Sequence, residues 1–482
     1  MKHRAFFLIF TLALFFCASI VTFGQTVRGR IEGAVKDPQG QVIPNVTVAA
    51  TNKETGQKSQ VTSTSEGTFV FSELQPGTYQ ISAELTGFKK ALIEGIIVQV
   101  ATTTGVTIEL QVGTVNEQVE ISADDAQVTI NNTNAEVGEV VDRQKILELP
   151  LDGRNPFELS ALQAGVQTKS NSDGEVSSFS INGNRTVANN LTVDGVNASD
   201  NFLKTPANIT LGVIPVSVES IAEFRVTTSL PAAEFGRGSA QINAVTASGT
   251  NKFRGSIFEF HRNTVFNANN FFNNSTILEN GKNVPREPLI RNQFGGRLGG
   301  PIIKDKTFFF FSYEGKRESR GFSRNRLVYT SQARQGIYRY VKGLPTTPAN
   351  AAAATVTAAA GIGTTTTQNG TCSASVLNVR PTGTLCTQNV LAINANRVTI
   401  DPTLAAYLAK TPLPNNFQIG DGLNTGGYRF NAKVISPTDQ FSTRFDHRIS
   451  DKHSFEATYN YGDINFNGDY INSGEEAFPG LS

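Results

Sequence analysis

Two residues that could bind a metal, His453 and Glu456, stand three positions apart in the sequence. HxxE opens a zinc signature in which the ion activates a water molecule for hydrolysis. The residues around the pair alternate in polarity as in a β-strand, where positions three apart point to opposite faces. No histidine follows Glu456 to complete the ligand set. The sequence therefore predicts no zinc site at this position.

The remaining histidines offer no base for a nucleophile. His3, His261 and His447 are few and scattered, and no GxSxG nucleophile elbow occurs. We therefore expect no catalytic residue, no resident metal ion and no cofactor.

A stretch near the end of the sequence nearly fits a calcium loop. Asp463, Asn465, Asn467 and Gly468 match the start of the DxNxNG pattern, but Glu475 follows one place too late. An EF-hand loop also needs a preceding helix, whereas a predicted strand precedes this one. We interpret the stretch as an ordinary Asn/Gly loop.

His453 and Glu456 belong to a predicted β-hairpin. Its arms, 441–449 and 453–461, alternate strictly on either side of a short turn. One face carries apolar and aromatic residues, and the other carries polar and charged residues that include Arg444, Asp446, Arg448 and Glu456. Such a hairpin suits a soluble sandwich in water, or a membrane barrel with a polar lumen and lipid outside.

The N-terminus has the organisation of a secretory signal peptide. Lys2, His3 and Arg4 precede an apolar run over 5–21, and small residues follow up to Gly24. We expect cleavage after Gly24. An uncleaved membrane anchor is the alternative, for which the run is short. After residue 24, no apolar run approaches the roughly 18 residues of a membrane-spanning helix. Only a β-barrel could therefore place the mature chain in a bilayer.

Charge argues against one class of partner. The sequence has 42 Lys and Arg against 41 Asp and Glu, and no basic block stands out. Nucleic-acid binding needs concentrated positive charge. We therefore expect no nucleic-acid partner.

Two cysteines, Cys372 and Cys386, remain after maturation. An oxidising, exported setting favours a disulfide between them across a short loop. Free thiols or half of a metal site are the alternatives, and no histidine or further cysteine lies nearby.

Residues 25–112 are predicted to form a β-sandwich. Seven strand-like runs are separated by turn residues such as Asp37-Pro38-Gln39-Gly40, and the runs are 30–35, 42–51, 58–64, 68–71, 77–85, 93–100 and 105–112. The phrases GAVKDPQGQVIPNVTV and TSEGTFVFSELQPGTYQISAELTGF resemble the carboxypeptidase regulatory-like domain. That resemblance implies a transthyretin-like sandwich, sometimes grouped with carbohydrate-binding folds, and implies no peptidase chemistry.

Residues 113–250 form a polar, Asn-rich linker and α+β segment, with helices expected at 142–149 and 155–163. Its phrases LPLDGRNPFELSALQAGV, SFSINGNRTVANNLTVDGV, VESIAEFRV and AAEFGRGSAQINAVTASGTN resemble the plug domain of Oar-like TonB-dependent outer-membrane receptors. In such a plug, Arg185, Asp194 and Arg237 would form ion pairs within the barrel lumen.

Residues 251–482 are predicted to contain the first strands of a barrel. Strands are expected near 253–262, 293–299 and 308–317 and in the hairpin, with a long irregular region over 321–437. The connections between strands run long, short, long, short, as in outer-membrane barrels. The phrases RNQFGGRLGGPIIKDKTFFFFSYEG and RVTIDPTLAAYLAKTPLPNN resemble the barrel of the same receptor family.

One short β-prone segment stands where such a receptor would need a contact for the periplasmic TonB protein. TonB can pair with an extended segment by strand addition. The candidate residues are Glu117, Gln118, Val119, Glu120, Ile121 and Ser122. The alternative is that they form the last strand or linker of the sandwich, and the sequence leaves both open.

The sequence thus predicts a mainly β chain: a transthyretin-like β-sandwich, an α+β plug domain and the start of an incomplete transmembrane antiparallel β-barrel. About five strands are expected, against about 22 in plugged transporters, so we interpret the chain as an N-terminal fragment. The resemblance implies an outer-membrane location, with sandwich and plug on the periplasmic side. It also implies TonB-driven uptake of an unidentified ligand, a glycan or a peptide, with TonB and outer-membrane lipid as partners. The alternative is a membrane-anchored adhesion or carbohydrate-binding protein.

Overall fold

The computed structural model describes most of the chain between residues 28 and 465. Its internal contacts divide the chain into two compact units. Unit 1 comprises 1–258, 294–315 and 439–463, and unit 2 comprises 259–293, 316–438 and 464–482. The predicted signal peptide, 1–24, lies outside the described residues. The described ranges are 28–113, 118–122, 128–130, 136–170, 176–198, 216–229, 240–275, 277, 281–341, 370–373, 385–391, 399–417, 419–450 and 453–465.

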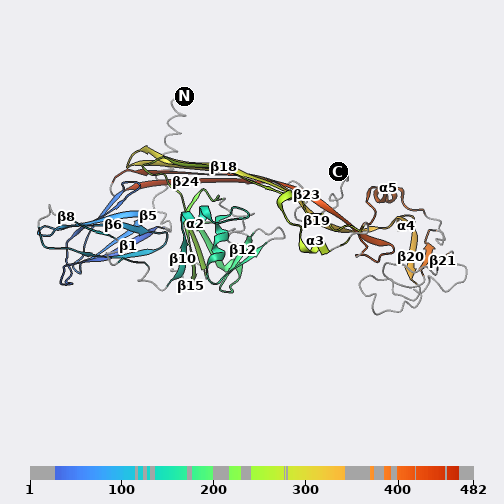
Figure 1. Cartoon of the computed structure of the whole chain (residues 1–482), viewed down its shortest axis with the longest axis horizontal. Coiled ribbons are helices and arrows are strands. Elements are labelled where there is room, and N and C mark those ends of the chain that lie inside the picture. The colour runs from blue at the N-terminus through green and yellow to red at the C-terminus, as the bar shows by residue number, and fades with distance from the viewer. Residues whose placement is uncertain are drawn as a thin grey trace, which may run out of the picture. The chain divides into compact units, whose positions relative to one another are not determined.

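The N-terminal part of unit 1 is a sandwich of two sheets, with strand orders β4-β1-β7-β9 and β3-β2-β5-β6-β8 (Figure 1). All seven strands predicted within 25–112 are present. Two further short strands from the following segment, β8 and β9, add one strand to each sheet. The bounds are β1 Gly29–Lys36, β2 Thr47–Asn52, β3 Lys58–Thr62, β4 Thr68–Leu74, β5 Gly77–Glu84, β6 Lys90–Val98, β7 Thr103–Glu109, β8 Gln118–Ser122 and β9 Val128–Ile130.

The sandwich core comes from alternate residues of its strands. Ile31 and Val35 of β1 pack in one buried cluster with Ile81 of β5. Each such side chain contributes about 1.5–3 kcal/mol when it leaves water. The turn after β1 is closed by Asp37, whose carboxylate accepts from the backbone N–H of Gln39 at 2.9 Å and of Gln41 at 2.8 Å. Local turn chemistry and alternation together produce the predicted architecture.

The second part of unit 1 is an α+β domain, as predicted. Its sheet has the order β10-β15-β16-β13-β14, and β11 and β12 form a separate hairpin (Figure 1). The strands are β10 Val137–Val141, β11 Val166–Ser170, β12 Val176–Ile181, β13 Asn189–Val193, β14 Val196–Asn197, β15 Ile221–Ser229 and β16 Ala240–Thr246. The helical elements are α2 Arg143–Glu148, η1 Pro156–Leu162 and η2 Thr186–Ala188.

Both helices predicted in this domain form, although the second is a 3₁₀ helix. Asp142 caps α2 by accepting from the N–H of Lys145 at 2.9 Å. Asn155 caps η1 by accepting from the N–H of Phe157 at 3.0 Å. Phe157 is buried on η1. At seven residues, η1 is longer than most 3₁₀ segments, which usually end after about three or four.

A third sheet has the order β17-β18-β19-β23-β24 and does not close on itself within the described residues (Figure 1). We call it the wall. Its strands are β17 Arg254–Asn263, β18 Leu289–Ile303, β19 Thr307–Tyr329, β23 Thr425–Arg448 and β24 Ser454–Ile464. The connections over 264–288, 304–306, 330–424 and 449–453 are long, short, long and short, as predicted.

The prediction of an irregular region over 321–437 is wrong. β19 continues to Tyr329, and β23 already begins at Thr425. In the missed part of β19 the buried alternate positions include Glu318 and Arg320. A strand whose inner face is charged lacks the apolar alternation from which strands are predicted.

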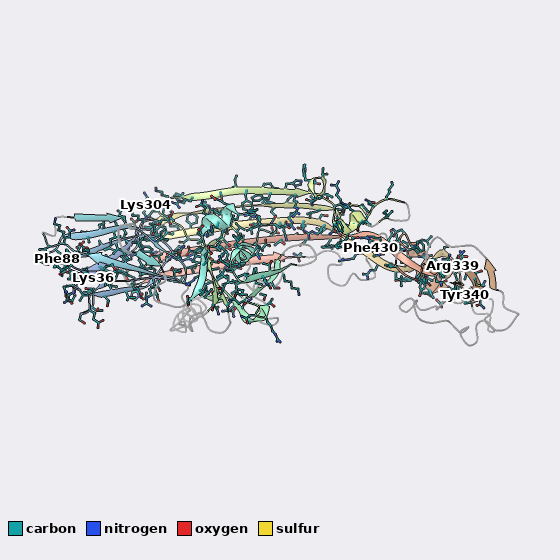
Figure 2. The ribbon with its side chains drawn as sticks, turned by 60° about the horizontal axis from the view of Figure 1, so that its bottom comes forward. Lys36, Phe88, Lys304, Arg339, Tyr340 and Phe430 are labelled. Carbon is teal, nitrogen blue, oxygen red and sulfur yellow. The ribbon has the colours of Figure 1, made fainter. Side chains whose placement is uncertain are left out.

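The long connection over 330–424 carries structure of its own in unit 2. A small sheet has the order β20-β22-β21. Arg339 and Tyr340 lie next to each other on β20 (Figure 2). The elements of the two long connections are η4 Thr264–Phe266, α3 Phe271–Ser275, α4 Ser331–Arg334, β20 Ile337–Val341, β21 Gly370–Ser373, β22 Leu385–Asn389 and α5 Pro402–Lys410. Among the described helices, none is long and apolar enough to cross a membrane.

Candidate functional site: the α+β domain and the wall of unit 1

The hairpin β23–β24 buries its polar side chains and exposes its aromatic ones. Ser442, Arg444 and Asp446 are 3%, 4% and 7% exposed, whereas Phe455 and Tyr459 are 50% and 57% exposed. Soluble proteins place these residue types the other way round. The predicted alternation is confirmed, and its charged face is the buried one.

Arg444 is the centre of a first ion-pair cluster. Its guanidinium lies 2.9 Å from Asp446, 3.2 Å from Glu456 and 3.7 Å from Asp194. Nη1 also donates to the carbonyl oxygen of Thr246 at 3.0 Å. Asp194 and Thr246 belong to the α+β domain, so the cluster joins that domain to β23 and β24. The buried guanidinium is tolerated because carboxylates surround it.

Of the three residues predicted to pair with the wall, Asp194 does so. Its carboxylate also accepts from the N–H of Thr246 at 2.8 Å and from the hydroxyl of Thr246 at 2.6 Å, which fixes its orientation. The prediction is wrong for Arg185, which is exposed before η2 and has no ion pair among the described residues. Arg237 lies outside the described residues.

A second cluster, centred on Glu219, was not found by sequence reasoning. Glu219 lies 3.1 Å from Arg297 of β18, 3.6 Å from Arg154 and 3.7 Å from Arg143. Arg154 in turn donates through Nε to Glu314 of β19 at 3.2 Å. Burial raises the pKa of Glu219, and the charge of Arg154 opposes that rise. This cluster joins the α+β domain to β18 and β19.

The two clusters make the contact between this domain and the wall polar. The buried apolar core of the domain runs from Val141 to Ala244 and contains no residue of the wall strands among those described. A polar interface can be rehydrated when its partners separate, because water replaces the lost hydrogen bonds. The described apolar core of the domain is therefore complete without the wall.

A third contact joins the sandwich to the α+β domain at the turn between β6 and β7. Glu223 of β15 accepts from the N–H of Val100, and Arg225 donates to the carbonyl oxygen of the following residue. Arg225 also pairs with Glu136 at 3.2 Å. Burial raises the pKa of Glu223 to about 7, opposed by the Val100 hydrogen bond and assisted by the charge of Asp142.

The sandwich also contacts the wall within unit 1. Arg28 pairs with Glu456, and Gln75 donates to the same carboxylate at 2.8 Å. Glu54 lies 3.2 Å from Arg254 of β17. Sandwich, α+β domain and wall together enclose a cavity of about 430 Å³, whose lining includes Arg28, Arg143, Arg254, Arg297 and Arg444.

Most of the predicted TonB-contact segment forms β8. The strand Gln118–Ser122 pairs in parallel with β6 and lies at the end of its sheet. Glu117 lies outside the described residues. The position of β8 matches the last-strand interpretation, and pairing with TonB stays a prediction.

The remaining candidates have structural surroundings. Cys386 is disulfide-bonded, and Cys372 lies directly opposite it in the register of β21 and β22. Glu456 of the HxxE pair is held by arginines, and the described part of the chain contains no cluster of metal-ligating side chains. Asp463 ends in β24. The other residues of the calcium pattern beyond Asn465 lie outside the described residues.

Two family models match the chain. Residues 245–482 match the outer membrane beta barrel domain, and residues 30–111 match the carboxypeptidase regulatory-like domain. With the exposed aromatic face of the wall, these matches define the class: an outer-membrane β-barrel protein with an N-terminal carboxypeptidase regulatory-like domain.

The chain is, more particularly, a homologue of the TonB-dependent transporter Oar from Myxococcus xanthus. The two are 28% identical over 289 residues, which are 59% of this chain and 26% of that protein. The chain thus spans about a quarter of the length of this relative. We refer below to the α+β domain as the plug, because its sequence resembles the plug domain of TonB-dependent receptors.

Two solved structures show a more distant likeness. The siderophore receptor PirA from Acinetobacter baumannii is 15% identical, with a TM-score of 0.27 over 69% of this chain and 44% of that one. The alcaligin outer-membrane receptor FauA from Bordetella pertussis is 12% identical, with a TM-score of 0.30 over 70% and 41% of the two chains. TM-scores this low establish neither fold nor function.

Proposed function

We propose that this protein takes up a ligand across the outer membrane by TonB-dependent transport, with TonB displacing the plug from the barrel lumen. The observation that carries the proposal is the polar contact between plug and wall at Arg444 and Glu219. A plug held by ion pairs and not by shared apolar core can be pulled away and can return, because water stabilises the separated surfaces. The relative Oar is named a TonB-dependent transporter, which supports the same function.

In this proposal the chain is divided as 1–24 signal peptide, 25–112 sandwich, 113–250 linker and plug, and 251–482 barrel strands and loops. Sandwich and plug face the periplasm. TonB pairs with the segment from Glu117 to Ser122 by strand addition. The position of β8 at the end of its sheet supports this, because the last strand of a sheet leaves one row of backbone groups open for a partner.

The transport step itself needs no covalent chemistry. Its free energy would come from the inner-membrane complex that energises TonB, and the protein would supply binding and a removable plug. We therefore propose a transporter that is not an enzyme. Among the described residues no observation favours the alternative of an adhesion or carbohydrate-binding protein.

Uptake in cells tests the proposal. Cells expressing the full-length protein receive radiolabelled peptide and oligosaccharide pools, and accumulated label is compared in TonB-containing and TonB-deficient strains. We expect accumulation above the level of cells lacking the protein only where TonB is present. Equal accumulation in both strains would overturn TonB-dependent transport.

A further inference from the structure

The near-neutral sequence hides an unequal distribution of charge between the two units. Unit 2 contains 17 Lys and Arg against 9 Asp and Glu, a net charge of +8, whereas unit 1 contains 25 against 32, a net charge of −7. A region with a large excess of one sign concentrates ligands of the opposite sign. Unit 2 is therefore suited to an anionic ligand.

Several arginines of unit 2 are held by uncharged groups. Arg334 donates to the carbonyl oxygens of Leu408 at 2.7 Å and of Thr411 at 2.6 Å. Arg286 donates to the carbonyl oxygen of Asn267 at 2.9 Å. Arg339, labelled in Figure 2, also donates to a backbone carbonyl, with Asp421 near enough to act on its charge. These hydrogen bonds fix the side chains without neutralising their charge.

One strand face shows how this unit binds a carboxylate. Glu318, Arg320, Phe322 and Arg324 occupy alternate positions of β19 and therefore share a face. The carboxylate of Glu318 lies 3.2 Å from Arg320 and also accepts from Arg291 of β18. This part of the face thus holds one carboxylate between two guanidinium groups.

Further along the same alternation, no carboxylate pairs with Arg324 or Arg326 among the described residues. Nε of Arg324 and Nη2 of Arg326 are buried without a hydrogen-bond partner among the described residues. The guanidinium of Arg324 lies 5.3 Å from the ring centre of Phe322, which orients it and leaves its charge in place. A buried N–H without an acceptor is unfavourable, so an incoming acceptor would be bound strongly.

We propose that Arg324 and Arg326 bind carboxylate groups of the transported ligand, and that the ligand class is a compound with two or more carboxylates. The proposal rests on the function proposed above. A planar guanidinium binds a carboxylate through two parallel hydrogen bonds. Glu318 provides an example of carboxylate binding by guanidinium groups on the same face.

Calorimetric titration with citrate, a tricarboxylate, tests this assignment. The full-length protein is purified from outer membranes in detergent, and the double variant Arg324→Gln, Arg326→Gln is compared with the parent. Loss of two charge-assisted contacts should weaken citrate binding about tenfold or more. The double variant Arg324→Lys, Arg326→Lys keeps the positive charge but loses the planar guanidinium groups. Its affinity for citrate should lie between those of the parent and the glutamine variant.

Lys410→Gln is the matched control, because it removes one charge from an exposed position on α5 of the same unit. It should change citrate binding less than about twofold. Heat-modifiable migration in gels shows whether each variant is folded. Three results would overturn the assignment: no citrate binding by the parent, equal loss in Lys410→Gln and the arginine variant, or tighter binding of phosphate than of citrate at equal ionic strength.

These titrations contain no TonB, so their outcome is independent of energised transport. Citrate binding with the expected arginine dependence, together with TonB-independent accumulation in cells, would overturn the proposed function and leave the binding site standing. Absent citrate binding together with TonB-dependent accumulation would overturn the ligand class alone.

Discussion

Several arginines of unit 2 have different partners from the arginines that join plug and wall in unit 1. In unit 1, Arg444 and Arg154 contact carboxylates that come from both plug and wall. In unit 2, Arg334 contacts backbone carbonyls and Arg324 contacts an aromatic ring. The same side chain therefore forms an internal cross-link where the chain supplies an acid, and keeps its charge available where the chain supplies none. The presence or absence of partner carboxylates thus distinguishes the plug–wall interface of unit 1 from the proposed binding surface of unit 2.

The largest effect is expected from Arg444→Gln. It leaves the buried Asp446 and the nearby Glu456 without their shared cation, and breaking such a buried cluster costs about 3–5 kcal/mol. The plug should then leave the lumen more often, so cells should become sensitive to vancomycin, which is too large for ordinary porins. Lys433→Gln, at an exposed position of the same strand, should leave sensitivity unchanged. Parental resistance of Arg444→Gln would contradict the account.

A pH effect is expected at Glu223, whose pKa burial raises from 4.5 to about 7. Because the carboxyl takes up a proton more readily when buried in the folded protein, its contribution is fully present below pH 4.5 and is lost as pH rises through about 7. The shift corresponds to at most about 3 kcal/mol. Hydrogen exchange of the amides at 99–102, corrected for intrinsic rates, should show stronger protection at pH 5 than at pH 8.

Glu223→Gln should abolish this pH dependence, because the amide does not titrate. Glu139→Gln, which removes an exposed acid on β10 paired with Lys145, should retain it. If Glu223→Gln and the parent showed the same pH dependence, another group would be responsible.

A somewhat smaller effect is expected from Glu219→Gln. The neutral amide fits the same space but cannot balance Arg154 and Arg297, which should cost about 1–3 kcal/mol. In Glu219→Gln, the gel band of the folded protein should disappear at a lower temperature than in the parent. Glu148→Gln, an exposed change on α2, is the control. Equal transition temperatures for the two variants would argue against a holding role for Glu219.

The smallest effect is expected at a surface pair in the sandwich. Lys53 and Glu94 are 2.5 Å apart, but their side chains are 40% and 36% exposed. Water screens such a pair, so its coupling should be below about 1 kcal/mol. A double-mutant cycle with Lys53→Ala and Glu94→Ala measures it directly. A coupling as large as that at Arg444 would show that burial does not set the strength of ion pairs in unit 1.

Sequence reasoning located the elements whose signals are local. The sandwich strands follow from alternation between turns, and the hairpin from alternation around a three-residue turn. The far half of β19 was missed because its inner face carries Glu318, Arg320 and Arg324 where an apolar pattern would have revealed it.

The site residues, too, divide into those that a local pattern predicted and those that it did not. Arg444, Asp446 and Glu456 were assigned to one face because they share the parity of a predicted hairpin. Glu219 and the pair Arg154–Glu314 were not found, because the members of that pair are 160 residues apart in the sequence and only the fold brings them together. No local pattern distinguishes such a glutamate from an exposed one.

Plug displacement is the central claim, and a reversible tether tests it most directly. Cysteines replace Arg154 of the plug and Glu314 of β19, whose side chains meet with Nε 3.2 Å from a carboxylate oxygen. A short cleavable thiol cross-linker then joins the two cysteines in the full-length protein in cells. Each single cysteine variant, treated in the same way, serves as the control. We predict that cross-linking stops TonB-dependent accumulation of label in the double variant alone and that cleaving the linker restores it. Undiminished accumulation with the tether in place would contradict the account.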